Sequence, residues 1–148
     1  MNSISFFMRI SKLIICSLFS LCALVGCKKE NLENTIVGKW NITKIEGLNE
    51  GRVVFSKSGL EAAEHIGYFS FTFTEYGGLI TEDYGTGYKD DWTYIIKGDH
   101  LHTNMFDDPD EDYLIIKTLT RKELVLSFEE DSDEGFQEGR LSFKRADQ

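Results

Sequence analysis

From residue 36 onward, apolar and polar residues alternate along short segments, as expected for strands that bury one face. The clearest example is the run in which Phe69, Phe71 and Phe73 are separated by Ser70 and Thr72. This period of two predicts that the three aromatic side chains share the buried face of one strand. Eight strands are predicted in this way, at residues 39–46, 68–74, 79–84, 92–96, 101–106, 113–118, 123–128 and 136–145.

The connections between these strands alternate in length along the chain. Three are tight, at residues 75–78, 97–100 and 119–122, and four are long, at residues 47–67, 85–91, 107–112 and 129–135. A single short helix is expected in the first long connection, at residues 59–65, where Ser58 and Glu61 have the spacing of a capping box. In an up-and-down antiparallel sheet, alternate connections lie at opposite ends. The predicted fold is therefore all-β: a single eight-stranded antiparallel up-and-down barrel with a closed base and an open end.

Several stretches of the chain resemble a known family. Gly38-Lys39-Trp40, at the head of the first predicted strand, resembles the Gly-x-Trp motif of the lipocalins. A wider pattern resembles the lipocalin-like, or calycin-like, lipoproteins of Bacteroidota, and it comprises residues 36–40, 71–77, 92–101 and 119–126. This resemblance implies that Trp40 plugs the closed base and that a basic residue near the end of the last strand, Arg145 or Arg140, packs across it. It also implies that the first long loop is a lid over the open end.

The first 27 residues have the features of a lipoprotein signal peptide. Two basic residues, Arg9 and Lys12, precede an apolar run at residues 13–25 that is too short to span a membrane. The ending Leu24-Val25-Gly26-Cys27 resembles a lipobox, in which a peptidase cuts before the cysteine and the thiol then carries diacylglycerol. We therefore expect a signal peptide at residues 1–26, a lipidated Cys27 with a tether to residue 35, and a barrel domain at residues 36–148.

These features predict a location in a bacterial cell envelope, with the domain held to a membrane by acyl chains such as palmitate. The residue after Cys27 is Lys28 rather than Asp, which resembles sorting to the outer membrane, while the leaflet is left open. The alternative is a cytosolic protein whose apolar N-terminal helix is buried.

Charge and cysteine content exclude some classes of function for the predicted mature domain. Loss of Arg9 and Lys12 with the signal peptide leaves 14 basic against 25 acidic residues, a formal charge of −11. Such a surface argues against nucleic acid as a partner, because phosphates require basic side chains for neutralisation. The other two cysteines, Cys16 and Cys22, lie in the predicted signal peptide. The predicted mature domain therefore has no disulfide and no thiolate metal site.

Aromatic residues on the predicted inner face are candidates for binding a small ligand. An eight-stranded barrel is just wide enough to be filled by side chains or to hold one small ligand. Sequence alone leaves both alternatives open. The candidate cavity residues are Phe69, Phe71, Phe73, Trp92, Tyr94, Leu124 and Leu126. Val54 and Phe55, in the first long connection, either cap a hydrophobic ligand or add a short strand to the sheet.

Metal and catalytic sites have weaker support. Two acidic clusters, residues 107–112 and 129–134, are either Ca²⁺ ligands or solvated loop tips. His100 and His102 lie on one face of a predicted strand, with Leu101 inward between them, but no third metal ligand is evident. The chain contains no Gly-x-Ser-x-Gly nucleophile motif. No cofactor, metal or enzymatic activity is therefore expected.

The resulting interpretation is an envelope lipoprotein that binds a small hydrophobic or amphipathic ligand without catalysis. Its partners would be a membrane, through the lipid anchor, and that small ligand. The alternative is a protein-interaction module with a filled barrel core that acts through its acidic loops, with a protein partner that the sequence does not identify.

Overall fold

The computed structural model describes residues 32–107, 112–129 and 135–146. These residues belong to one compact unit, Asn31–Gln148. The predicted signal peptide, Cys27 and the start of the tether lie outside the described residues, as do the centres of the two acidic clusters, residues 108–111 and 130–134. In the part of the chain that the structure describes, no helix has the length and apolar character needed to cross a membrane.

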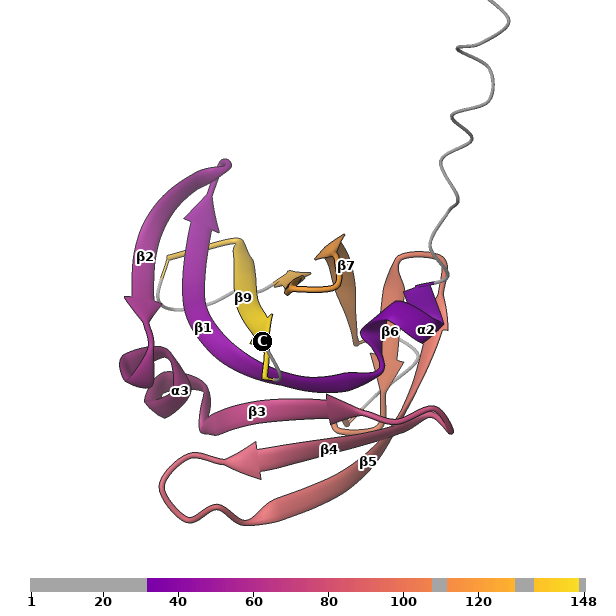
Figure 1. The fold of residues 1–148 in the computed structure, drawn as a ribbon. Coiled ribbons are helices and arrows are strands. Elements are labelled where there is room, and N and C mark those ends of the chain that lie inside the picture. Colours follow the sequence, from indigo (N-terminus) through magenta and orange to yellow (C-terminus); the bar gives the residue numbers. More distant parts are fainter. Residues whose placement is uncertain (1–31, 108–111, 130–134, 147–148) are drawn as a thin grey trace, which may run out of the picture. The chain divides into compact units, whose positions relative to one another are not determined.

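Nine antiparallel strands and two short helices form the described part of the fold (Figure 1). The strands are β1 (Gly38–Asn49), β2 (Arg52–Ser58), β3 (Tyr68–Phe73), β4 (Gly78–Asp83), β5 (Lys89–Lys97), β6 (His100–Thr103), β7 (Tyr113–Leu119), β8 (Glu123–Glu129) and β9 (Glu138–Arg145). The helices are α2 (Leu32–Ile36) and α3 (Leu60–Ile66). All eight predicted strands are present, and β2 is an additional one. The all-β prediction is confirmed.

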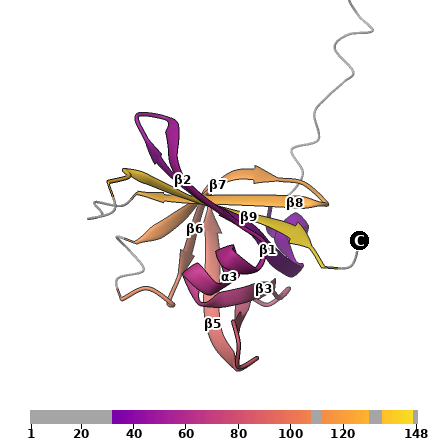
Figure 2. The same cartoon turned by 90° about the vertical axis from the view of Figure 1, so that its left-hand side faces the viewer.

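The sheet closes on itself through β1. One edge of β1 pairs with β9, from Trp40↔Arg145 to Leu48↔Glu138. The other edge pairs first with β3, along residues 38–41, and then with β2, along residues 44–49. β1 and β3 to β9 therefore form the predicted ring of eight strands, and β2 continues the sheet beside the far half of β1 (Figure 2).

The ring has two unlike ends. Consecutive strands of the ring are antiparallel, so the tight turns after β3, β5 and β7 share one end, the base. The connection from β1 to β3, which contains β2 and α3, and the longer connections after β4, β6 and β8 join strands of the ring at the other, open end. This confirms the alternation predicted from connection lengths. The β4–β5 connection is shorter than predicted, because β5 begins at Lys89 rather than at Trp92.

The helix α3 is present as predicted, but its predicted cap is wrong. Ser58 is the last residue of β2 and pairs with Lys44, so its backbone is part of the sheet. Gly59 occupies the N-cap position with φ of 59°, and no side chain caps the helix. Burial holds α3 in place instead, since Ala62 and Ala63 are almost completely buried in the core cluster.

Aromatic and aliphatic side chains fill the barrel interior. Phe71 lies against Phe143 with ring centres 5.1 Å apart, and Phe73 meets Tyr94 edge to face at 5.0 Å. Phe69 departs from the predicted alternation, because the β3–β4 register shifts between Tyr68 and Ser70, and it is only half-buried. The most deeply buried hydrophobic residues of the ring are Trp40, Phe73, Leu79, Leu101, Leu124, Leu126 and Phe143.

Trp40 and Arg145 seal the base, and we call this pair the base latch. The guanidinium carbon of Arg145 lies 4.3 Å from the centre of the Trp40 ring. Its N–H groups donate hydrogen bonds to the carbonyls of Thr35 at 2.6 Å, Val37 at 2.8 Å and Arg121 at 2.8 Å. One side chain thus joins the last strand to the first strand, to the chain that precedes it and to the β7–β8 turn.

The end of the predicted tether forms part of this seal. Residues 32–36 form α2 rather than an extended tether, and Ile36 is completely buried. The carbonyl of Ile36 accepts a hydrogen bond from Trp40 Nε1 at 2.6 Å. Gly38 has φ of 133°, and a Cβ there would collide with the Arg145 guanidinium. The Gly-x-Trp motif therefore supplies both the ring that Arg145 covers and the space for its guanidinium.

We predict that Arg145→Ala lowers the free energy of unfolding by about 2–4 kcal/mol, because it removes three charge-assisted hydrogen bonds and the contact with Trp40. Arg145→Lys should restore less than half of this loss, because one ammonium group does not reproduce the planar fork that meets three carbonyls. Urea denaturation of the full chain, followed by tryptophan fluorescence, measures both effects.

Lys144→Ala, at the neighbouring exposed position, is the matched control and should stay within about 0.5 kcal/mol of the wild type. Equal stability of the Arg145→Ala and Lys144→Ala variants would show that the base latch does not hold the barrel closed.

Candidate functional site

The barrel wall opens at its rim between β7 and β8. The ladder between these strands ends at the pair Ile115↔Ser127, although β7 begins two residues earlier and β8 continues two residues further. On β7, Leu114 pairs only with β6, and on β8, Phe128 pairs only with β9. The two strands therefore part from each other at the open end.

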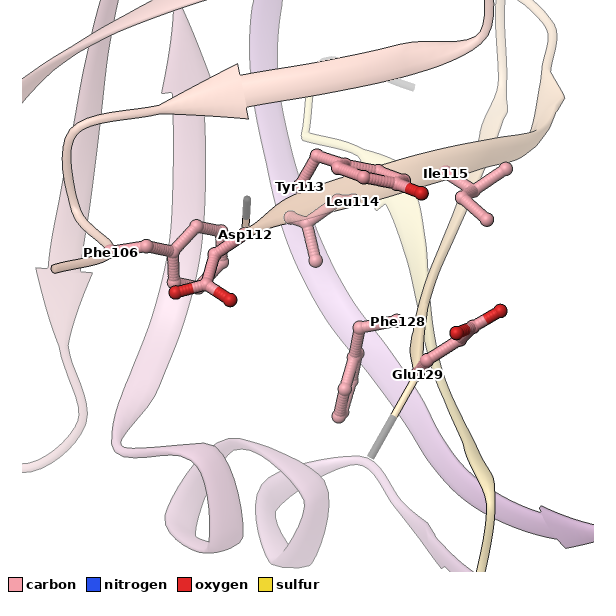
Figure 3. Close-up of a pocket in the computed structure, with 7 residues that line it drawn as sticks. All are labelled: Phe106, Asp112, Tyr113, Leu114, Ile115, Phe128 and Glu129. Atoms are coloured by element: carbon pink, nitrogen blue, oxygen red, sulfur yellow. The ribbon is translucent and has the colours of Figure 1, made fainter. Parts of the chain in front are cut away.

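A pocket of about 500 Å³ occupies this opening, and we call it the rim pocket (Figure 3). Its lining comes from the segment after β6, from the start of β7 and from the end of β8: Phe106, Asp112, Tyr113, Leu114, Ile115, Phe128 and Glu129. The volume lies within the range of roughly 300–1,000 Å³ that is typical of small-molecule sites. Apart from two carboxylates and one phenol, the lining side chains are apolar.

The inner wall of the rim pocket is continuous with the hydrophobic core. Leu114 is 3% exposed and belongs to the core cluster. Phe106 and Phe128 are partly buried and pack against the same cluster from the rim. A ligand in the rim pocket would therefore touch apolar surface that already faces the barrel interior.

Two facing glycines make room for aromatic rings at the open end. Gly47 of β1 pairs with Gly139 of β9. A Cβ on Gly139 would collide with the ring of Phe128, and a Cβ on Gly47 would lie 2.7 Å from that of Phe136. Phe136 also stacks on Phe55 of β2, with ring centres 6.4 Å apart. These three phenylalanines form an aromatic layer, and Phe128 is the member that lines the rim pocket.

The carboxylates of Asp112 and Glu129 flank the rim pocket. Among the described residues, neither forms an ion pair with a basic side chain. Lys117 of β7 and Arg140 of β9 face another acid instead: Arg140 Nε lies 2.8 Å, and Lys117 Nζ 4.0 Å, from Glu138 Oε1. The hydrogen bonds from Arg140 hold the pKa of the Glu138 carboxyl below its ordinary value. The rim carboxylates thus keep charge that no neighbouring cation neutralises.

The ligand residues predicted on β3 and β5 lie deeper in the barrel. Phe71 and Phe73 belong to the packed interior. Trp92 Nε1 donates a hydrogen bond to Thr81 Oγ1 at 3.0 Å. The Tyr94 hydroxyl donates to the carbonyl of Thr74 at 3.0 Å, and burial raises the pKa of Tyr94 above its ordinary value. None of the predicted cavity residues lines the rim pocket.

Val54 and Phe55 form part of a strand, which was one of the two alternatives for the first long connection. Val54 is 55% exposed on β2. Phe55 faces the other way, with its ring centre 5.0 Å from that of His65 on α3 and its face stacked on Phe136. Phe55 therefore contributes to the aromatic layer at the open end, and Val54 lies on the surface.

The two strand histidines face outward, as the alternation predicts, with Leu101 fully buried between them. The rings of His100 and His102 are 6.3 Å apart, and the Tyr113 ring lies 4.3 Å and 5.6 Å from them. No group of three or more His, Cys, Asp or Glu that could hold a metal ion is present in residues 32–107, 112–129 and 135–146. The Ca²⁺ hypothesis concerns the acidic clusters, whose centres lie outside these ranges.

Comparison with protein families agrees with this architecture. A family model described as a lipocalin-like domain matches residues 36–126. The chain belongs to the lipocalin-like domain family. The match begins at Ile36 in the base and ends at Leu126 in β8, so it includes the Gly-x-Trp motif and most of the ring. A search of curated proteins gives no match. A lipocalin-like domain suggests a ligand-binding barrel.

Sequence reasoning missed the apolar residues of the rim pocket in this lipocalin-like domain. Asp112 and Glu129 were considered only as members of the acidic clusters, and neither Phe106 nor Phe128 was considered as a site residue. A signal was present, because each of these two phenylalanines immediately precedes an acidic cluster at the predicted open end. The family match covers Phe106 and the start of β7 but ends before Phe128 and Glu129.

We predict that Gly139→Ala destabilises the lipocalin-like domain by about 1–3 kcal/mol, because its Cβ displaces the Phe128 ring from a packed position. In a Phe128→Leu background, the same substitution should cost less than about 1 kcal/mol, since the smaller side chain leaves room for the methyl group. Unfolding free energies of the four variants of this double-mutant cycle test the contact. Equal costs in both backgrounds would show that Phe128 does not rest on Gly139.

Proposed function

We propose that this lipocalin-like domain binds a small apolar or amphipathic molecule in the rim pocket, without catalysis, as part of a lipid-anchored envelope protein. The observation that carries the proposal is the parting of β7 and β8, which leaves an apolar pocket of about 500 Å³ at the open end. Phe106 and Phe128 supply aromatic surface on which a ligand can pack.

The packing of the barrel favours the rim over the barrel axis as the place of binding. The base latch closes one end, and ring contacts of Phe71 and Phe73 occupy the interior. A ligand that enters from the rim replaces water without displacing these rings. Its apolar end would meet Leu114 and Phe128, behind which the candidate cavity residues lie.

The lining of the rim pocket supports binding rather than catalysis. Among the described residues that line it there is no imidazole, thiol or aliphatic hydroxyl, and the titratable groups are Asp112, Glu129 and the phenol of Tyr113. The two carboxylates stand at the rim, where water reaches them.

The predicted anchor would orient the barrel relative to a membrane. Five Cα–Cα steps, across residues 28–31, separate Cys27 from Leu32, the first residue of α2 at the base. Fully extended, they reach at most about 18 Å. The base would then face the bilayer and the rim pocket would face away from it, toward ligands delivered from the aqueous side.

We predict that 4-phenylbutanol, a small amphipathic alcohol, binds the full chain and that Phe106→Asp weakens this binding by at least about tenfold, because an apolar contact is replaced by a charge. Isothermal titration in a non-ionic detergent, with protein-free detergent as the blank, measures the affinity. Tyr76→Asp is the matched control, because Tyr76 is 95% exposed in the β3–β4 turn at the base.

Unchanged binding by the Phe106→Asp variant would place the ligand elsewhere. Absence of binding by the wild type would overturn the ligand-binding proposal. It would favour the alternative, a protein-interaction module with a filled core.

We also predict that Cys27→Ser abolishes incorporation of labelled palmitate and moves the protein out of the membrane fraction of its host, because the thiol that would carry diacylglycerol is lost. Cys22→Ser, within the predicted signal peptide, serves as the control and should leave both properties unchanged. A Cys27→Ser protein that still carries label in the membrane fraction would contradict the proposed anchor.

A further inference from the structure

We propose that the rim pocket selects amphiphiles that carry a positive charge beside an apolar body. This inference rests on the proposed function and names the ligand class of the same pocket. It follows from the position of two carboxylates on a lining that is otherwise aromatic and aliphatic.

The charged side chains that line the rim pocket, in the part of the chain that the structure describes, are all of one sign. Asp112 immediately precedes β7 and Glu129 ends β8, so the two carboxylates stand at the ends of the two strands that part to form the opening. In the described part of the chain, neither has a basic partner. Arg140 and Lys117 are held by Glu138 on the outer face, so they do not offset the charge at the rim.

The aromatic lining favours the same ligand charge. Phe106, Tyr113 and Phe128 line the rim pocket, and the faces of such rings attract ammonium groups. The chain as a whole has a formal net charge of −9, which attracts cations and repels anions at longer range. A cationic amphiphile matches both the apolar and the charged part of the lining. Its apolar body would pack on Leu114 and Phe128, and its ammonium group would lie toward the rim carboxylates.

Three probes with the same apolar body test this selectivity on the full chain: 4-phenylbutyltrimethylammonium, 4-phenylbutanol and 4-phenylbutyl sulfate. We expect the cation to bind about three- to tenfold more tightly than the alcohol, as two partly exposed charge pairs allow, and the sulfate to bind most weakly. Raising the salt concentration should reduce the advantage of the cation and leave the binding of the alcohol unchanged.

The double variant Asp112→Asn/Glu129→Gln should bring the affinity for the cation to within about twofold of that for the alcohol, because both charge pairs are removed. The matched control, Glu75→Gln/Glu123→Gln, removes the same number of charges from exposed positions at the base. It should keep most of the selectivity, since only long-range attraction is reduced.

The outcomes separate this inference from the proposed function. If the alcohol binds and the cation binds no more tightly, the proposed selectivity for cations is wrong, but the proposal that the rim pocket binds a ligand is retained. If the control variant loses as much selectivity as the rim variant, net charge and not the rim pocket selects the ligand, and the inference is overturned. If none of the three probes binds, both proposals fail.

Discussion

The contact of Arg145 with Trp40 is the interaction on which the barrel depends. A ring of strands must join its last strand to its first, and here that junction is the β1–β9 ladder, which begins at the pair Trp40↔Arg145. The guanidinium then donates to three carbonyls from two segments that are far apart in sequence, residues 35–37 and Arg121. Because each carbonyl would otherwise lose its partner at a closed end, the same side chain closes the ring, seals the base and fixes α2 beneath it.

At the open end, by contrast, the β1–β9 ladder carries glycines, which leave space for side chains from other segments. Gly47 and Gly139 face each other at the far part of the same β1–β9 ladder, and aromatic rings from β8 and the β8–β9 connection lie over them. Phe128 is thereby drawn toward β9 while the ladder between β7 and β8 ends at Ile115↔Ser127. The β1–β9 ladder therefore contributes to both ends of the barrel. Trp40 and Arg145 close the base, and Gly47 and Gly139 leave room for aromatic rings at the rim.

Much of this fold follows from local patterns, whereas the site does not. Alternation identified the strands and the inward residues such as Phe71 and Leu101, because burial of one face has a period of two. It failed at Phe69, where a register shift interrupts that period, and at Ser58, where strand pairing overrides a local capping signal. The rim pocket depends on where one ladder stops and on a cross-strand contact between Phe128 and Gly139. Neither is encoded in the spacing of nearby residues, so the pocket became visible only in three dimensions.

The number of strands explains why free volume collects at the rim. An eight-stranded ring leaves an interior that is just wide enough for side chains, and here rings from the two strands that flank β1, such as Phe71 of β3 and Phe143 of β9, already meet inside it. Additional space requires two neighbouring strands to part, which costs ladder hydrogen bonds least where the strands end. Such a place borders the loops, so its lining combines loop residues such as Asp112 with residues at strand ends such as Glu129. Substitutions at the rim can therefore change the pocket while the packed core and the base stay the same.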